Sequence, residues 1–87
     1  MRLYLIRHGQ SYNNALADIR QRKQDPELTA LGEEQAQFAA DYLGNHLSDH
    51  LYDEPFSITH LYCSAMYRAM QTAHPISKAL GMPAQVW

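Results

Sequence analysis

Two short segments of the chain carry the residue types of a phosphate-binding site. Arg7 and His8 follow a short apolar run, and Ser64 and Arg68 follow a second run much further along the chain. Guanidinium groups are planar, permanently charged forks that match phosphate oxygens. A neutral histidine offers a nucleophilic ring nitrogen, and histidine is among the side chains that form covalent intermediates. Together these residue types indicate a phosphate pocket with His8 positioned to attack phosphorus.

A parallel sheet would bring the two segments together. Residues 2–6 are mostly apolar and predict a buried strand, and residues 57–63 predict a second strand. In open parallel sheets the ligand crevice lies outside the carboxyl ends of the strands, which is where His8 and Ser64 fall. The helix that follows Ser64 would carry Arg68 about one turn from its start and would add free N–H donors for an anion.

Two apolar stripes predict the helices between the strands. The first covers residues 28–47, with apolar side chains at spacings of mostly three and four and Thr29 as the N-cap. The second covers residues 66–80 and ends at Gly81, which is suited to a left-handed cap. Pro75 lies inside the second stripe and is expected to kink or split the helix.

Strands that alternate with helices predict the fold class. A third strand begins at residues 84–87. This order is typical of an α/β fold with three layers, α/β/α, and a mainly parallel sheet, here only its N-terminal part with about three strands and three helices. Residues 10–24 fit a short helix or an ordered loop, and residues 45–55 fit a frayed helix end and a surface loop. Gly32 is expected to be a packing glycine.

The composition is that of a globular chain. Of 87 residues, 46% are hydrophobic and 18% are charged, and the net charge of −2 argues against a nucleic-acid partner. No apolar run is long enough for a membrane helix, so no membrane partner is expected. Cys63 is the only cysteine, which excludes an internal disulfide and a cysteine metal cage. A cytoplasmic protein is expected, and the sequence leaves its oligomeric state open.

At its chemistry-bearing residues the sequence resembles the histidine phosphatase superfamily, also called phosphoglycerate-mutase-like. The resemblance rests on three segments in the family's order, namely residues 5–11 with Asn14, residues 25–36 and residues 64–73. A lone Arg-His-Gly tripeptide is a modest signal, but three motifs spread over most of the chain are a strong one.

The resemblance implies a role for each matching residue. His8 would be the nucleophile that becomes phosphohistidine, and Arg7 and Arg68 would clamp the phosphoryl group. Asn14 and Ser11 would line the phosphate or substrate side of the pocket. The family needs no metal or other cofactor, and the implied ligand is a small phosphorylated substrate.

The resemblance also implies that residues 1–87 are the N-terminal part of a single histidine-phosphatase-like domain, truncated at its third strand. The family's catalytic acid and second histidine would follow Trp87, so the 87 residues alone are expected to be inactive. The Gly-Trp pair that glycolytic mutases carry before the position of Asp25 is absent, and Asn13 stands where mutases often have tryptophan. These departures favour a broad-specificity phosphomonoester hydrolase. The alternatives are a phosphoglycerate-mutase-type phosphoryl transferase and a non-enzymatic phosphate-binding fragment.

Overall fold

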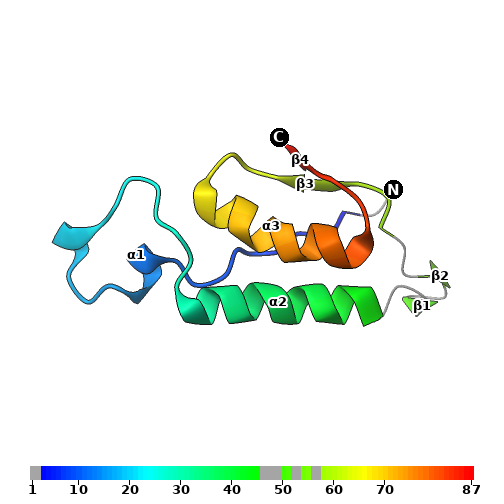
Figure 1. The fold of residues 1–87 in the computed structure, drawn as a ribbon, viewed down its shortest axis with the longest axis horizontal. Helices are drawn as coiled ribbons and strands as arrows, with labels where there is room; N and C mark the ends of the chain where they lie inside the picture. The colour runs from blue at the N-terminus through cyan, green and yellow to red at the C-terminus, as the bar shows by residue number, and fades with distance from the viewer. Residues whose placement is uncertain (1–2, 46–49, 52–53, 56–57) are drawn as a thin grey trace.

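The fold consists of two long helices packed beneath a small parallel sheet, with a lobe of short elements at one end (Figure 1). The computed structural model describes residues 3–45, 50–51, 54–55 and 58–87. The elements, in chain order, are α1 (Tyr12–Ala15), the 3-10 turn η1 (Ile19–Gln21), α2 (Ala30–Asn45), β1 (His50–Leu51), β2 (Glu54–Pro55), β3 (Leu61–Cys63), α3 (Tyr67–Leu80) and β4 (Ala84–Val86).

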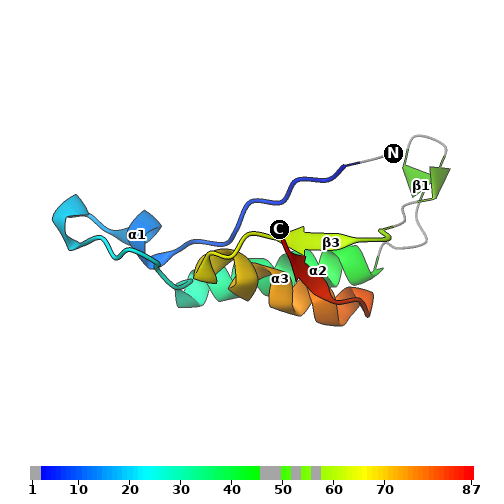
Figure 2. The ribbon, with the colours of Figure 1, turned by 90° about the horizontal axis from the view of Figure 1, so that it is seen from above.

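The predicted α/β class is confirmed by the unit β3–α3–β4. The two strands run parallel, with Leu61 opposite Ala84 and Cys63 opposite Val86, and α3 makes the crossover between them. Both α2 and α3 lie on the same side of this sheet (Figure 2). The part of the chain that the structure describes therefore contains one helical layer and the sheet, rather than all three expected layers.

The core lies between α2 and α3. Ala40, Leu43 and Ile76 are buried there. The partly buried apolar side chains that pack against them are those of Ala39, Ile58, Leu61 and Leu80. Alanines on the buried face of α2 are small enough to let the helices approach closely. The N-cap prediction is confirmed, because the Thr29 hydroxyl accepts a hydrogen bond from the Gly32 N–H at 3.1 Å.

Helix α3 ends where the sequence predicts and continues where a break was expected. Gly81 adopts a left-handed conformation with φ of 66°, and its N–H donates to the Ser77 carbonyl. Pro75 lies inside the helix without splitting it. Proline removes one backbone hydrogen bond, but Ala73 and Ile76 on either side of it are buried. Their packing holds both turns in place.

The prediction of a buried first strand is wrong for the described residues 3–6. They belong to no strand, and the side chain of Leu5 is 87% exposed. Figure 2 shows the segment as a separate trace that does not join β3. An apolar run predicts a tendency to be buried, but a strand also requires a neighbour that pairs with its backbone groups, and among the described residues β3 pairs with β4 alone.

The remaining segments are short. Residues 10–24 form α1 and η1, and the segment expected as a surface loop contains β1 and β2, which pair antiparallel with His50 opposite Pro55. The predicted second strand is observed as β3, and residue 57 lies outside the described residues. Among the described ranges, no helix is both long and apolar enough to cross a membrane.

Candidate active site

The ring of His8 is held at both nitrogens. Its Nδ1 lies 2.7 Å from the carbonyl oxygen of Gly9, and its Nε2 lies 3.2 Å from Nε of Arg68. A carbonyl can only accept a hydrogen bond and a guanidinium can only donate one, so Nδ1 carries the proton and Nε2 presents its lone pair. The half-buried His8 is thus fixed in one tautomer, with its lone pair on Nε2 facing Arg68.

Two glycines hold the backbone next to His8 against the start of α2. A Cβ added to Gly9 would overlap the carbonyl of Gly32, and a Cβ added to Gly32 would overlap the carbonyl of Gln10. The Thr29 N–H also donates to the Gln10 carbonyl at 2.9 Å. Gly32 is therefore a packing glycine, as predicted. Its role is to let residues 8–10, the His8 segment, lie directly on α2.

Helix α3 holds the other side of the site. Arg68 lies in its first turn, and Thr72 follows one turn later with 6% of its surface exposed. The Thr72 hydroxyl accepts from the Gly9 N–H at 3.1 Å and donates to the Arg68 carbonyl at 2.8 Å. The His8 segment is thus bonded to α3 through backbone as well as side-chain groups.

Arg7 and His8 share one hollow of about 230 Å³. Its described lining is Arg7, His8, Gly9, Gln35, Ala36, Ala39 and Thr72. None of these residues is a carboxylate, so the formal charge of this described lining comes from Arg7 alone. A small anion fits both the charge and the size of this hollow.

The structure places Ser11 and Asn14 at the start of α1. Ser11 is 2% exposed, its hydroxyl donates to Asn14 Oδ1 at 3.0 Å, and it accepts from the Asn14 N–H at 3.3 Å. The two side chains form a capping box that holds the short helix. Neither residue is among the described lining of the hollow that contains His8.

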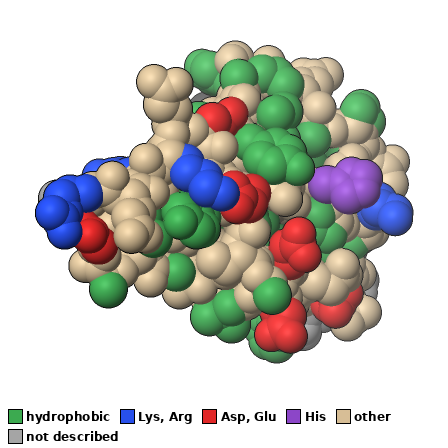
Figure 3. Space-filling view, turned by 60° about the vertical axis from the view of Figure 1, so that its left-hand side comes forward, with side chains coloured by type: hydrophobic (Ala, Val, Ile, Leu, Met, Phe, Trp, Pro, Cys, Tyr) green, Lys and Arg blue, Asp and Glu red, His purple; other side chains and the backbone are tan. Residues whose placement is uncertain are grey.

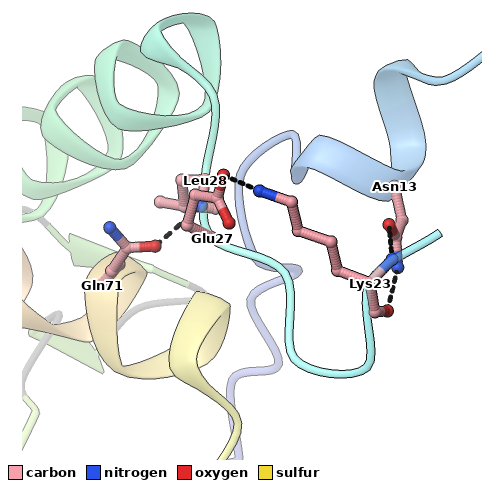
Figure 4. A network of polar contacts seen from close by, with 5 residues as sticks. All are labelled: Asn13, Lys23, Glu27, Leu28 and Gln71. Atoms are coloured by element: carbon pink, nitrogen blue, oxygen red, sulfur yellow. Dashed lines mark hydrogen bonds and ion pairs between the residues drawn. The ribbon is translucent and has the colours of Figure 1, made fainter. Parts of the chain in front are cut away.

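The N-terminus of α3 is already engaged by a carboxylate. Asp25 Oδ1 accepts from the Tyr67 N–H at 3.0 Å, so one of the free N–H donors expected for an anion is occupied. Gln71 of α3 also contacts the segment that carries Asp25, since its Oε1 accepts from the Leu28 N–H at 2.7 Å (Figure 4). Asp25 and Gln71 together fix the first turns of α3, where Arg68 lies.

A network in the α1 lobe continues from this contact (Figure 4). The Asn13 amide bonds the Lys23 backbone in both directions, at 2.9 and 2.8 Å, and Lys23 Nζ donates to Glu27 Oε1 at 2.9 Å. The Lys23 ammonium holds the pKa of the Glu27 carboxyl below its ordinary range, chiefly through this hydrogen bond. Figure 3 shows basic side chains of this end lying beside acidic ones, so their charges are largely balanced locally.

Known proteins share both the sequence motifs and the fold of this chain. The sequence profile of the histidine phosphatase superfamily (branch 1) matches residues 3–87. The chain belongs to the histidine phosphatase superfamily. The probable phosphoglycerate mutase GpmB of Yersinia enterocolitica is 34% identical over 82 residues, which are 94% of this chain and 33% of that protein.

Solved histidine phosphatase structures share the fold. A mycobacterial glucosyl-3-phosphoglycerate phosphatase has a TM-score of 0.64 at 29% identity, over 92% of this chain and 33% of its own. The phosphoserine phosphatase of Entamoeba histolytica, in complex with 3-phosphoglyceric acid, has a TM-score of 0.65 at 26% identity, over 92% of this chain and 34% of its own. The chain therefore spans about a third of the length of these relatives.

Within the histidine phosphatase fold, sequence reasoning located some site residues and missed others. The structure brings together His8 and Arg68 directly, and Arg7 with His8 in one hollow. The contacts of Thr72 and Asp25 were missed, although the two residues lie inside the segments 64–73 and 25–36 that carry the family resemblance. Their position in a motif beside an expected catalytic residue was the available signal.

Proposed function

We propose that the protein is a phosphomonoester hydrolase that works through a phosphohistidine on His8, with residues 1–87 as the N-terminal part of its histidine-phosphatase-like domain. The observation that carries the proposal is the double contact of His8, with Nδ1–H bonded to the Gly9 carbonyl and the Nε2 lone pair facing Arg68. A fixed tautomer with its lone pair on Nε2 meets the requirement for nucleophilic attack once Arg68 releases that lone pair.

The first half-reaction transfers the phosphoryl group to His8. Nε2 donates its lone pair to phosphorus, the P–O bond to the leaving group breaks, and the leaving oxygen keeps the electron pair and takes up a proton. The imidazole ring gains positive charge as the N–P bond forms. The Gly9 carbonyl, 2.7 Å from Nδ1, stabilises that charge through its hydrogen bond.

Arg68 has a different partner at each stage of this reaction. Without substrate, its Nε–H donates to Nε2 of His8 and so covers the lone pair. Arg68 is not among the described lining of the hollow, and its link to the hollow is its contact with His8. A phosphate that enters the hollow and reaches Nε2 of His8 is a stronger acceptor than the neutral imidazole because it is charged. We therefore expect Arg68 to turn its hydrogen bond to a phosphate oxygen and to free Nε2. Arg7 and Arg68 then stabilise the charge on the equatorial oxygens in the transition state.

The second half-reaction regenerates the enzyme. Water attacks phosphorus, the P–N bond breaks with its electron pair returning to Nε2, inorganic phosphate leaves, and the water proton passes to solvent. In a mutase, a hydroxyl of the substrate would take the place of water. This second candidate is favoured by the sequence relatives that are named probable phosphoglycerate mutase, and it differs in releasing no inorganic phosphate.

A labelling experiment tests the nucleophile. The chain is exposed briefly to radiolabelled p-nitrophenyl phosphate, whose leaving group departs without a proton donor, and acid-labile label is measured. We expect label on the native chain, none on His8→Ala, and undiminished label on His74→Ala, which removes an exposed histidine of α3 outside the site. Unlabelled native chain, or label that persists in His8→Ala, contradicts the proposal.

A comparison of leaving groups tests the inactivity expected of the 87 residues alone. No described residue that lines the hollow is a carboxylate able to protonate a leaving alkoxide. General acid catalysis contributes roughly 10²–10⁴-fold, so turnover of an alkyl phosphate by the chain should be lower than that of the aryl phosphate by about this factor, beyond the intrinsic difference between the esters. Equal turnover after that correction would mean that a proton donor is present in the chain.

A further inference from the structure

The hydrogen bonds around His8 form a closed ring of four. His8 Nδ1–H donates to the Gly9 carbonyl, Gly9 N–H donates to the Thr72 hydroxyl, Thr72 donates to the Arg68 carbonyl, and Arg68 Nε–H donates to His8 Nε2. The lengths are 2.7, 3.1, 2.8 and 3.2 Å in that order. Each of the four residues donates once and accepts once, so the direction of every proton is determined.

From this ring we infer that Thr72 is a positioning residue, which sets the relative placement of the nucleophile and the arginine for the function proposed above. Thr72 lines the hollow together with His8, but its hydrogen bonds go to neither Nε2 of His8 nor the Arg68 guanidinium. It acts through the Gly9 amide, which adjoins His8, and through the backbone carbonyl of Arg68.

The surroundings of Thr72 make its hydroxyl hard to replace. Thr72 is 6% exposed and Gly9 is buried, so water has little access to the Gly9 N–H if the hydroxyl is removed. A buried donor left without an acceptor is unfavourable, and the backbone relieves it by moving. Gly9 cannot move toward α2, since the Gly32 carbonyl is already in close contact with it. The His8 segment must therefore shift away from α3, which lengthens the contact between His8 and Arg68.

The choice of threonine rather than another residue of its size follows from the two bonds. Valine has nearly the same shape but neither accepts nor donates, so Thr72→Val opens the ring at two positions. Serine keeps the hydroxyl, so Thr72→Ser closes the ring and loses only a methyl group. Ser77→Ala is a matched control, because it removes a hydroxyl that bonds the Met82 carbonyl at the far end of the same helix.

Nitrogen NMR of isotope-labelled histidine in the 87-residue chain reports whether each imidazole nitrogen of His8 carries a proton or a lone pair. In the native chain, His8 should show one protonated-type and one lone-pair-type nitrogen, the signature of a single tautomer. In Thr72→Val the Gly9 carbonyl still holds the proton on Nδ1, but Nε2 loses its donor, so the Nε2 resonance should move downfield toward that of a lone pair without a hydrogen bond. Thr72→Ser and Ser77→Ala should retain the native pattern. An unchanged Nε2 resonance in folded Thr72→Val would overturn the proposal.

The affinity for inorganic phosphate, measured by calorimetry, gives a second readout. Valine keeps the shape that threonine gives to the lining of the hollow, so Thr72→Val removes only the bonds of the hydroxyl. A hydrogen bond to a charged group is worth about 1.5–3 kcal/mol, so a displaced Arg68 predicts at least about a tenfold loss in Thr72→Val. Thr72→Ser should stay close to native. An unchanged affinity in Thr72→Val, or an equal loss in Ser77→Ala, would contradict the role.

A measurement on the native chain covers the case in which Thr72→Val does not fold. The Thr72 hydroxyl proton should be protected from exchange and should show a nuclear Overhauser effect to the Gly9 N–H. A rapidly exchanging hydroxyl would overturn the proposal without any variant. The result is independent of the labelling experiment, since the ring can be intact in a chain that never becomes phosphorylated.

Discussion

Gly32 and Gly44 lie in the same helix but should respond in opposite directions to the same substitution. In Gly32→Ala the new methyl group would overlap the carbonyl of Gln10, which belongs to the backbone and cannot rotate away. In Gly44→Ala the methyl group would lie 3.4 Å from the Cβ of Ala79, an ordinary van der Waals contact. The pair therefore separates close packing from helix propensity.

The magnitudes follow from these two environments. Overpacking costs about 1–3 kcal/mol, which outweighs the roughly 1 kcal/mol that alanine gains over glycine within a helix. Gly32→Ala should then lower the free energy of unfolding by up to about 2 kcal/mol, while Gly44→Ala should raise it by up to about 1 kcal/mol. For a chain of this size, each kcal/mol corresponds to about 4–8 °C in Tm.

Urea unfolding followed by circular dichroism measures both variants against the native chain. The expected order of transition midpoints is Gly44→Ala, native, Gly32→Ala, with unchanged slopes. Phosphate affinity provides a second comparison, because Gly32 supports the backbone beside His8 and Gly44 does not. A stabilised Gly32→Ala would refute the reasoning, since it would mean that the Gln10 carbonyl can yield at no cost.

Two further predictions concern the contacts that hold α3 and the α1 lobe. Asp25→Ala should lower the free energy of unfolding by about 0.5–2 kcal/mol in urea titrations, because the Tyr67 N–H loses its acceptor. Asp25→Asn keeps an acceptor oxygen and should recover most of that loss. Equal losses in the two variants would show that the charge of Asp25 matters and its hydrogen bond does not. Lys23→Met should raise the pKa of Glu27 toward its ordinary value in a carbon NMR titration. Because folding lowers the pKa of Glu27, the ion pair stabilises the fold at pH values above the pKa that Glu27 has in the unfolded chain. This stabilisation is lost as the pH falls through the pKa of Glu27 in the folded chain. A Glu27 pKa that is unaffected by Lys23→Met would contradict the pairing.

The helices and their ends were predictable because the necessary information is local. Thr29 and Gly81 each act through residues within one or two turns, so their caps follow from the adjacent sequence. Pro75 was misjudged in part for the same reason. Its local effect is unfavourable, but the burial of Ala73 and Ile76 depends on α2, which a reading of the second stripe alone does not include.

The candidate site was predictable where a residue type carries its own chemistry. His8 and Arg68 stand out as a potential nucleophile and a permanent cation, and the sequence predicted that they would meet. The predicted means, two adjacent parallel strands, is not observed, because residues 3–6 form no strand. Thr72 carries no such signal, because a hydroxyl inside a helix most often bonds its own backbone. Its second bond, to the Gly9 amide, depends on how an extended segment lies across two helices, and that placement is a property of the tertiary structure.

The separation of the ring's partners along the chain has a consequence for local opening. Its two cross-links to the His8 segment join residues 60 and 63 positions apart, whereas the bonds of α3 connect neighbouring turns. The ring can therefore open while α2 and α3 remain packed, because the hydrogen bonds within each helix do not depend on it. His8 and Arg68 separate in that opened state. An anion that binds only the closed state would raise the stability of the N-terminal segment by RT ln(1 + [anion]/Kd), and so with the logarithm of its concentration once the site is filled.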